Sequence, residues 1–113
     1  MQNFDFLSEA PMAVTVCDKK GIIVYMNRKS ASTFQADGGL DLVGKSLLEC
    51  HPALAREKLL TMLREQKANT YTIEKKGLHK LIHQTPWFEN GKFSGLIEFS
   101  FEIPVEIPHF IRG

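Results

Sequence analysis

The chain has 113 residues, the size of one domain, and a chain of this length buries roughly two thirds of its unfolded surface when it folds. Its 43% hydrophobic and 24% charged residues are ordinary for a globular protein and argue against a disordered tail or a collagen-like repeat. The formal net charge of +1 gives no bulk electrostatic reason to expect a nucleic-acid or membrane-surface binder. No stretch approaches the roughly 20 apolar residues that a membrane-spanning helix needs.

The N-terminal sequence and the cysteines indicate the compartment. The first ten residues, MQNFDFLSEA, lack the basic start and apolar centre of a signal peptide, so we expect a cytoplasmic location. Cys17 and Cys50 are far apart and form no CxxC pair, which favours reduced thiols, although only their distance in the fold decides this. Two cysteines and four scattered histidines predict no structural zinc site.

The start of the chain predicts a short helical segment and then a hairpin. Residues 1–10 predict one or two helical turns that lie on the body of the domain or on a second copy, and Pro11 ends them. Residues 12–18 alternate between apolar and polar positions, and residues 22–26 are β-branched and aromatic, so both segments predict strands. A turn that contains Gly21 joins these strands into a hairpin.

The middle of the chain predicts helices. Asn27 is a good N-cap for a short helix over residues 28–34, and residues 42–48 predict a second short helical piece. Pro52 suits the first turn of a longer helix over residues 53–67. That helix carries an apolar stripe that predicts core packing, formed by Ala55, Leu59, Met62 and Leu63.

The last third of the chain predicts three strands and a tail. Residues 70–76, 79–88 and 93–101 alternate or are rich in strand-forming residues, and Pro86 must disturb its strand or lie near an edge. The tail, residues 104–113, contains two prolines and is extended. It carries so many apolar side chains that we expect it to pack on something.

The order of these elements predicts an α+β protein. Clustered helices between two groups of strands favour a five-stranded antiparallel sheet with helices packed on one face and a pocket between them. We expect a single domain over residues 1–113. Its parts are an N-terminal helical cap (1–10), a core (11–103) and an extended apolar tail (104–113).

Three motifs in this order resemble the PAS domain family. Residues 11–18 followed by GIIVYMN (21–27) resemble the opening hairpin of the family, and LVGKSL (42–47) resembles its signature of hydrophobic, Gly, Lys or Arg, Ser or Asn, hydrophobic. Asn90-Gly91 through Glu98 resembles its final hairpin and strand. The resemblance covers about residues 8–103, and it implies a sensory module of a signalling protein with the PAS-like sheet described above.

The chain departs from this family at two positions. FEIP (101–104) stands where Asp-Ile-Thr often leads into an effector helix, so the resemblance does not imply direct helical coupling to a kinase or a cyclase. Leu47 stands where the flavin-binding light sensors of the family have a cysteine, so we do not expect a flavin adduct.

The segment Cys50-His51-Pro52 resembles a Cys-His-Pro found in a subset of bacterial PAS-like sensors. In the family this region borders the pocket, so a neutral imidazole at His51 would ligate heme iron or hydrogen-bond a small ligand. Alternatively, His51 caps the following helix or bonds a backbone carbonyl. Cys50 is a redox or covalent thiol, or simply a small buried hydrophobe. The identity of any cofactor stays open.

The candidate ligand-binding residues share a polar group and a predicted place near the pocket; they are His51, Cys50, Tyr25, Gln84 and Trp87. Tyrosine and tryptophan combine a large apolar body with one hydrogen-bonding group, which suits ligand recognition or an interface. The register of residues 79–88 decides which side chains face inward, and Pro86 can shift that register. The sequence leaves open whether Leu81 and His83 or Ile82 and Gln84 face the pocket.

The sequence favours a binding function over catalysis. It contains no GxSxG, phosphate-binding glycine loop, HExxH or credible carboxylate pair. We expect a non-enzymatic sensory domain that binds a small ligand or a signalling protein partner in or on its cavity, forms a homodimer, and binds neither nucleic acid nor membrane. One alternative is a homodimerisation scaffold with a filled core. Another is a small cavity enzyme, for which only Glu98 suggests itself, although the alternation places Glu98 opposite the apolar face.

Overall fold

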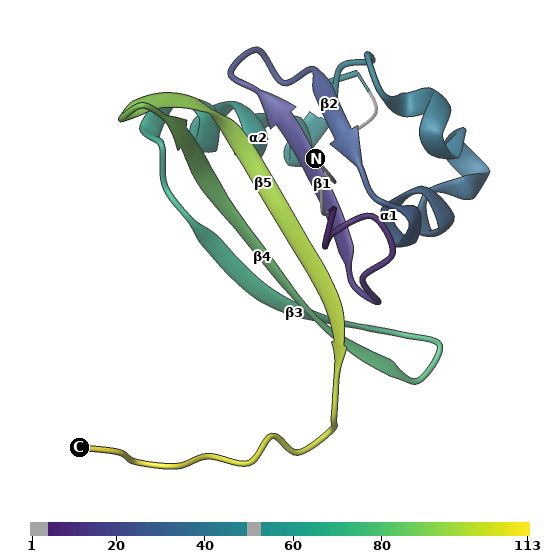
Figure 1. Ribbon diagram of the computed structural model, residues 1–113, viewed down its shortest axis with the longest axis vertical. Coiled ribbons are helices and arrows are strands. Elements are labelled where there is room, and N and C mark those ends of the chain that lie inside the picture. The colour runs from purple at the N-terminus through teal and green to yellow at the C-terminus, as the bar shows by residue number, and fades with distance from the viewer. Residues whose placement is uncertain (1–4, 50–52) are drawn as a thin grey trace.

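The computed structural model describes residues 5–49 and 53–113, and in this part of the chain helices lie on one side of a curved sheet (Figure 1). The strands are β1 (Ala13–Asp18), β2 (Ile23–Met26), β3 (Asn69–Lys75), β4 (Leu78–Glu89) and β5 (Lys92–Ile103). The helices are α1 (Arg28–Thr33), α2 (Ala53–Glu65) and two short 3-10 helices, η1 (Gln35–Asp37) and η2 (Gly39–Leu42).

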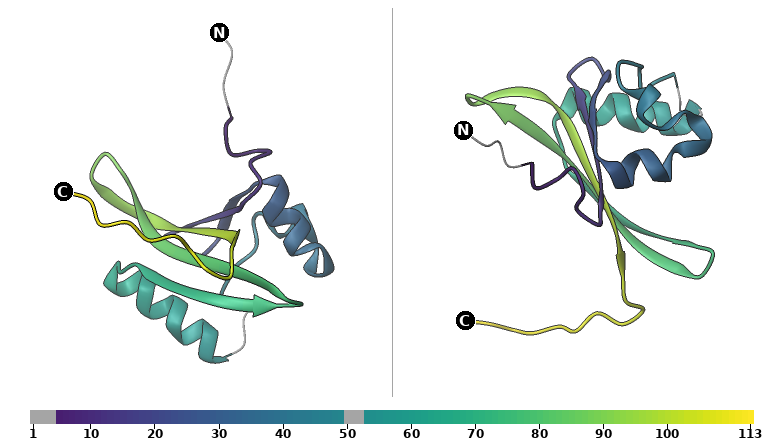
Figure 2. Two further views of the ribbon diagram at one scale, coloured as in Figure 1. Left: turned by 90° about the horizontal axis from the view of Figure 1, so that it is seen from below. Right: turned by 45° about the vertical axis from the view of Figure 1, so that its right-hand side comes forward.

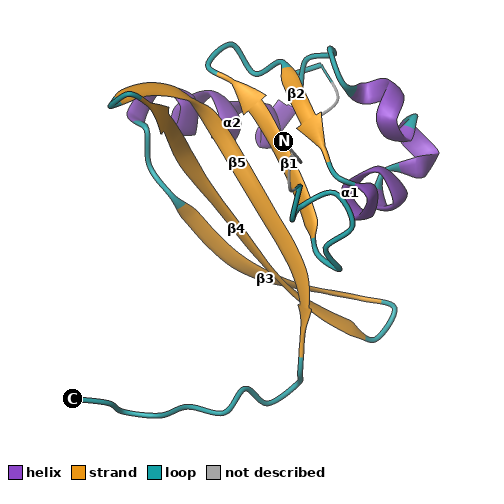
Figure 3. Cartoon of the chain, in the orientation of Figure 1, coloured by secondary structure: helices purple, strands orange, loops and turns teal. Residues whose placement is uncertain are grey.

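The strand order is β2-β1-β5-β4-β3, and every pair of neighbours is antiparallel. Figure 3 shows two halves of the sheet, the hairpin β1–β2 and the three-stranded meander β3–β4–β5, which the pairing of β1 with β5 joins. Both α1 and α2 lie on the same face of this sheet (Figure 2). The predicted α+β class, with a five-stranded antiparallel sheet and helices on one face, is confirmed.

The junction of β1 and β5 requires a glycine. Gly95 has φ +149°, and a Cβ atom at this position would overlap the carbonyl oxygen of Cys17. Trp87 pairs with Gly95 across β4 and β5, and its indole Nε1 donates a hydrogen bond to the same carbonyl of Cys17 at 2.9 Å. The missing side chain of Gly95 therefore lets Trp87 on β4 reach β1, two strands away.

Asn27 holds the β1–β2 half together. Its Oδ1 accepts from the backbone N–H of Ser30, which makes it the predicted N-cap of α1, and from the N–H of Val14 on β1, both at 3.0 Å. Its Nδ2 donates to the carbonyls of Leu7 and Met12 at 2.7 and 2.8 Å. This side chain is 2% exposed, and all four of these bonds join it to backbone groups.

Two apolar clusters connect the helices to the sheet. Leu59 and Met62 of α2 pack on Cys17 of β1 and Leu96 of β5, as the predicted stripe requires. The second cluster lies under α1 and η2 and contains Ile23, Met26 and Leu42, with the half-buried Phe34 and Leu47 against it. The core is therefore divided, and the space between its two parts becomes the site described below.

Three local predictions need correction or refinement. Residues 5–10 form turns and not the expected helical cap. In the predicted helical piece 42–48, η2 ends at Leu42 and the chain continues in turns, because Gly44 takes φ +95° and the backbone bonds to Ile23 on β2. Pro86 lies on β4, but β3 pairs with β4 only as far as Gln84, so Pro86 is at a local edge, as proline requires.

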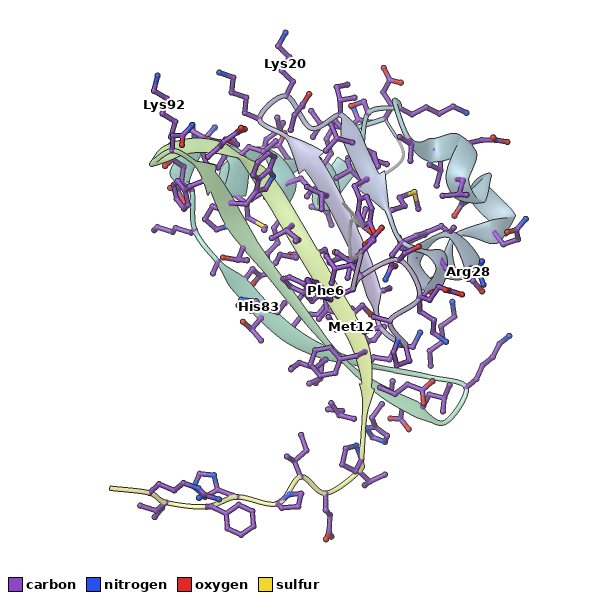
Figure 4. The ribbon with its side chains drawn as sticks, viewed as in Figure 1. Phe6, Met12, Lys20, Arg28, His83 and Lys92 are labelled. Carbon is purple, nitrogen blue, oxygen red and sulfur yellow. The ribbon has the colours of Figure 1, made fainter. Side chains whose placement is uncertain are left out.

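The tail after β5 leaves the body of the domain. Residues 104–113 have no regular secondary structure and run away from the sheet as an extended segment (Figure 2). Their side chains stand clear of the rest of the protein (Figure 4), and Phe110 and Ile111 are 70% and 93% exposed. In the described part of the chain, neither α-helix is long and apolar enough to cross a bilayer.

Candidate functional site

A cavity of about 690 Å³ lies between the sheet and the helices. This volume is within the usual range for pockets that hold small organic ligands. Much of its wall is apolar, formed by Ala13, Cys17, Ile23, Met26, Leu42, Leu59, Met62, Ile82 and Leu96. Leu59 and Met62 of α2 pack on Cys17 and Leu96, while Leu42 of η2 packs in a second cluster on β2, and residues of both clusters line the cavity.

A row of polar side chains crosses the floor of this cavity. Asn69, Gln84 and Glu98 are direct cross-strand partners on β3, β4 and β5, so their side chains lie next to one another on one face. Gln84 Nε2 donates to Glu98 Oε2 at 2.7 Å, and Asn69 Nδ2 donates to Gln84 Oε1 at 3.0 Å. Because a carboxylate only accepts, it fixes the orientation of the Gln84 amide and through it that of Asn69.

The row continues to β1 and α1. Thr15 pairs with Glu98 across β1 and β5, and its hydroxyl shares a 2.5 Å hydrogen bond with the buried hydroxyl of Ser30. Tyr71 is the next cavity-facing residue of β3 after Asn69. Burial, and secondly the negative charge of Glu98, raise the pKa of Tyr71, which keeps its hydroxyl neutral. The floor therefore offers one carboxylate, two amides and neutral hydroxyls.

The carboxyl group of Glu98 has no cationic partner among the described residues. No Lys, Arg or His of the described residues lies within ion-pair distance of its carboxylate, and Gln84 is its hydrogen-bond donor. The cavity has basic side chains, but they are on other parts of its wall. Lys80 precedes Gln84 by four residues on β4, a separation of about 13 Å along a strand.

The other charged wall residues are Asp37, Lys58 and Lys75, and all three are exposed. They belong to η1, α2 and the end of β3 far from Asn69, and we call these residues, together with Lys80, the rim. The wall therefore combines an apolar lining, a fixed negative charge on the floor and a mostly positive rim.

The predicted site residues separate into three groups. Gln84 lines the cavity, so the open question about register is answered: Ile82 and Gln84 face inward, while Leu81 and His83 do not line the cavity. His83 instead shares a 2.8 Å hydrogen bond with Thr70. Cys50 and His51 lie outside the described residues, so their roles stay predictions.

Tyr25 and Trp87 do not line the cavity. Trp87 bonds to the Cys17 carbonyl across Gly95, as described above. Tyr25 pairs with Val16, next to the strand position of cavity-lining Thr15, and its buried hydroxyl has no hydrogen-bond partner among the described residues. Burial, with a smaller effect from the charge of Asp5, raises its pKa. A ligand role for these two residues has no support from their positions.

Sequence reasoning set Glu98 aside, and the structure puts it at the centre of the cavity floor. The apolar face of β5, with Phe99 and Phe101, is the face away from the cavity, and the polar face with Glu98 and Ser100 is the inner one. The sequence signal for this site was one polar residue on each of three consecutive strands, Asn69, Gln84 and Glu98. Only the correct register of β3, β4 and β5 shows that these residues are neighbours.

The described residues also include one cysteine, Cys17. Cys17 is a free, buried thiol on the wall of the cavity, and burial raises its pKa, which disfavours the reactive thiolate form. Among the described residues, no cluster of three or more His, Cys, Asp or Glu side chains is placed to hold a metal ion.

Comparisons with known proteins agree with this geometry. A family model described as the PAS fold matches residues 7–104. The PAS domain of Bordetella pertussis BvgS is 24% identical and superimposes with a TM-score of 0.62, covering 87% of this chain and 81% of that one. A C-terminal domain from Streptococcus mutans is 20% identical with a TM-score of 0.68, covering 85% and 78%.

A third solved structure comes from the Aer2 receptor of Vibrio cholerae, described as a dual PAS-heme oxygen sensor. It is 23% identical with a TM-score of 0.57, and the match covers 82% of this chain and 95% of that one. At these identities the likeness shows a shared fold. A comparison with curated protein sequences finds no match.

Proposed function

The chain belongs to the PAS fold family, and we propose that it is a non-enzymatic sensory domain that binds a small organic ligand in the cavity between its sheet and helices. The observation that carries this proposal is the hydrogen-bonded row Asn69–Gln84–Glu98 on the floor of an otherwise largely apolar cavity. A few convergent polar groups in an apolar pocket are what fixes the orientation of a small ligand. A scaffold with no ligand has no need to face a carboxylate toward an open space.

Native mass spectrometry of freshly purified protein tests this proposal. We expect an adduct of a small molecule that denaturation removes. The variant Ser100→Phe places a bulky side chain in the cavity and is expected to lose the adduct. Thr72→Phe adds the same bulk to an exposed position of β3 outside the cavity and is expected to keep it. An adduct that both variants retain would place the ligand elsewhere and contradict the proposal.

Heme is one specific ligand hypothesis, because the family resemblance implies a position near the pocket for His51 and the Aer2 structure is described as a heme sensor. No histidine lines the cavity among the described residues. An absorbance spectrum decides the question: heme gives a Soret band that His51→Ala removes, and a colourless protein excludes it. The cytoplasmic location and bacterial origin stay predictions from the sequence.

A second proposed role is homodimerisation, and one observation favours it. Phe99 and Phe101 lie on the sheet face away from the helices and are only half-buried, and Val105, Ile107, Phe110 and Ile111 of the tail are exposed. A second copy of the chain supplies both a sheet face and a tail to cover this apolar surface. Light scattering after gel filtration is expected to give a dimer that Phe110→Ser with Ile111→Ser weakens. A monomer at high concentration would contradict this role.

A further inference from the structure

We propose that the ligand of this cavity is a small organic monocation, a protonated amine on an apolar body, whose charged nitrogen binds Glu98. This inference rests on the proposed function, because it names the chemical class of the ligand for the same cavity. It starts from Glu98, a carboxylate on the cavity floor that has no ion-pair partner among residues 5–49 and 53–113.

The hydrogen bonds of the floor leave acceptors available for an amine. Gln84 donates to one oxygen of Glu98, while the other oxygen, Oε1, accepts no hydrogen bond from the described residues. Asn69 uses its Nδ2 on Gln84, so its own amide oxygen is likewise left as an acceptor. An ammonium group has three donors and no acceptor, which matches a floor whose remaining capacity is acceptors.

The neighbours of Glu98 suit a cation better than an anion. Tyr71 follows Asn69 on the cavity side of β3, and its pKa is raised mainly by burial and to a smaller extent by the charge of Glu98. A neutral tyrosine ring near a carboxylate provides an aromatic surface for a cation. An anionic ligand group at this point would meet the Glu98 charge at close range in a partly desolvated site, which is unfavourable.

The rim disfavours a second positive charge on the ligand, because its charged residues are three lysines and one aspartate, Asp37. Lys58, Lys75 and Lys80 belong to the cavity wall, and Lys80 is about 13 Å along the strand from the Gln84 position. A second cationic group on a long ligand would reach these lysines and be repelled. The apolar wall between floor and rim, which includes Met26, Leu59 and Ile82, fits a hydrocarbon or aromatic body instead.

Isothermal titration calorimetry with three matched probes tests the inference. The probes are 2-phenylethylamine, 2-phenylethanol and 3-phenylpropanoate, which share an aromatic body and differ in charge. We expect the amine to bind at least about 10-fold more tightly than the other two, the range of a charge-assisted hydrogen bond. The diamine 1,5-diaminopentane, with two charges and no aromatic body, is expected to bind more weakly than 2-phenylethylamine.

Two variants locate the preference. Glu98→Gln keeps the size of the side chain and an oxygen that accepts from Gln84, but removes the charge, so it is expected to abolish the preference for the amine. Glu102→Gln makes the same change four residues along β5, at an exposed position that does not line this cavity, and is expected to leave the preference intact. A melting curve for each variant shows that it is folded.

The possible results of these titrations test the amine inference separately from the proposed function. Equal binding of amine and alcohol, tighter binding of the carboxylate, or an amine preference that survives in Glu98→Gln overturns the inference, while binding in the cavity would still support the proposed function. If none of the probes binds, the amine inference is also overturned. The native mass spectrum of the purified protein, which needs no probe, then decides the proposed function separately.

Discussion

Asn27 and Glu98 show how differently the two halves of the sheet use buried polar groups. Asn27 makes four hydrogen bonds to the backbone and is 2% exposed, so nothing of its capacity is left for a ligand. Glu98 is half-buried, has one side-chain hydrogen bond, and faces a cavity. In the β1–β2 half the polar capacity of Asn27 is used within the fold, whereas in the β3–β4–β5 half acceptors of Glu98 and Asn69 remain on the wall of the cavity, where we propose that a ligand binds.

The polar groups of the two halves are also expected to contribute differently to folding stability. Removing a partner from a fully bonded, buried network leaves backbone groups without hydrogen bonds, which destabilises the fold. Removing a charge that has no ion-pair partner costs little folding free energy and changes binding instead. A substitution of Asn27 is therefore expected to lower the free energy of unfolding, whereas a substitution of Glu98 is expected to change ligand binding and leave stability nearly unchanged.

The largest effect is expected from Gly95→Ala at the β1–β5 junction. The added methyl group would overlap the Cys17 carbonyl at a backbone φ of +149°, so the strands must separate and Trp87 loses its acceptor. We expect a loss of at least about 3 kcal/mol in the free energy of unfolding. Urea denaturation measures it. Gly91→Ala, at φ +78° with no atom near the new Cβ, is the control and is expected to cost about 1 kcal/mol. Equal losses in both variants would contradict the close contact.

Asn27→Ala is expected to be the next most damaging change. It removes the N-cap of α1 and leaves the N–H of Val14 and the carbonyls of Leu7 and Met12 without this partner. The expected loss is about 3 kcal/mol, from one cap and several buried hydrogen bonds. Arg28→Ala removes the neighbouring exposed ion pair with Glu9 (Arg28 is labelled in Figure 4) and is expected to cost less than about 0.5 kcal/mol. Equal decreases in melting temperature for Asn27→Ala and Arg28→Ala would show that the hydrogen bonds of Asn27 do not hold the β1–β2 half together.

Because of Cys17, the free energy of unfolding is expected to depend on pH in the alkaline range. Because burial raises the folded-state pKa of this thiol above its ordinary value of 9.0, the unfolded chain ionises first as the pH rises. The stability from the neutral thiol is fully present below pH 9.0 and is lost above it, by up to about 1.4 kcal/mol per pH unit. Cys17→Ala lacks this dependence, so its deficit against the natural chain should shrink between pH 8 and pH 10 in urea titrations. A deficit that stays constant would show that the thiol titrates normally.

The smallest effect on stability is expected from Glu98→Gln. The side chain keeps its hydrogen bond from Gln84 and has no ion pair with a residue that the structure describes, so the free energy of unfolding should change by less than about 1 kcal/mol. Chemical denaturation of Glu98→Gln and Asn27→Ala under the same conditions compares their losses of unfolding free energy. A loss as large as that of Asn27→Ala would mean that the row serves the fold, and the distinction between the two halves would fail.

Local patterns in the sequence predicted the parts of the fold that local physics determines. The N-cap at Asn27, the stripe of Leu59 and Met62, and the five strands follow from residue type and spacing. The prediction of a helical piece at 42–48 is wrong because backbone hydrogen bonds to β2 hold this segment in turns. No local sequence pattern reveals these bonds.

The cavity and its floor could not be predicted in the same way. Alternation on β5 shows which residues share a face, but not which face meets the helices, and here Glu98 is inward while Phe99 and Phe101 are not. The row with Gln84 and Asn69 depends on the register of three strands far apart in sequence. The size of the cavity depends on where α2 rests on the sheet, which side-chain packing decides.

The side-chain amide signals of Gln84 and Asn69 in a ¹H–¹⁵N spectrum test the central claim most directly, because both groups belong to the cavity floor. During titration with 2-phenylethylamine, both signals should shift saturably in the natural chain and stay nearly unchanged in Glu98→Gln. Binding of the amine that leaves both signals in place in the natural chain would contradict the account.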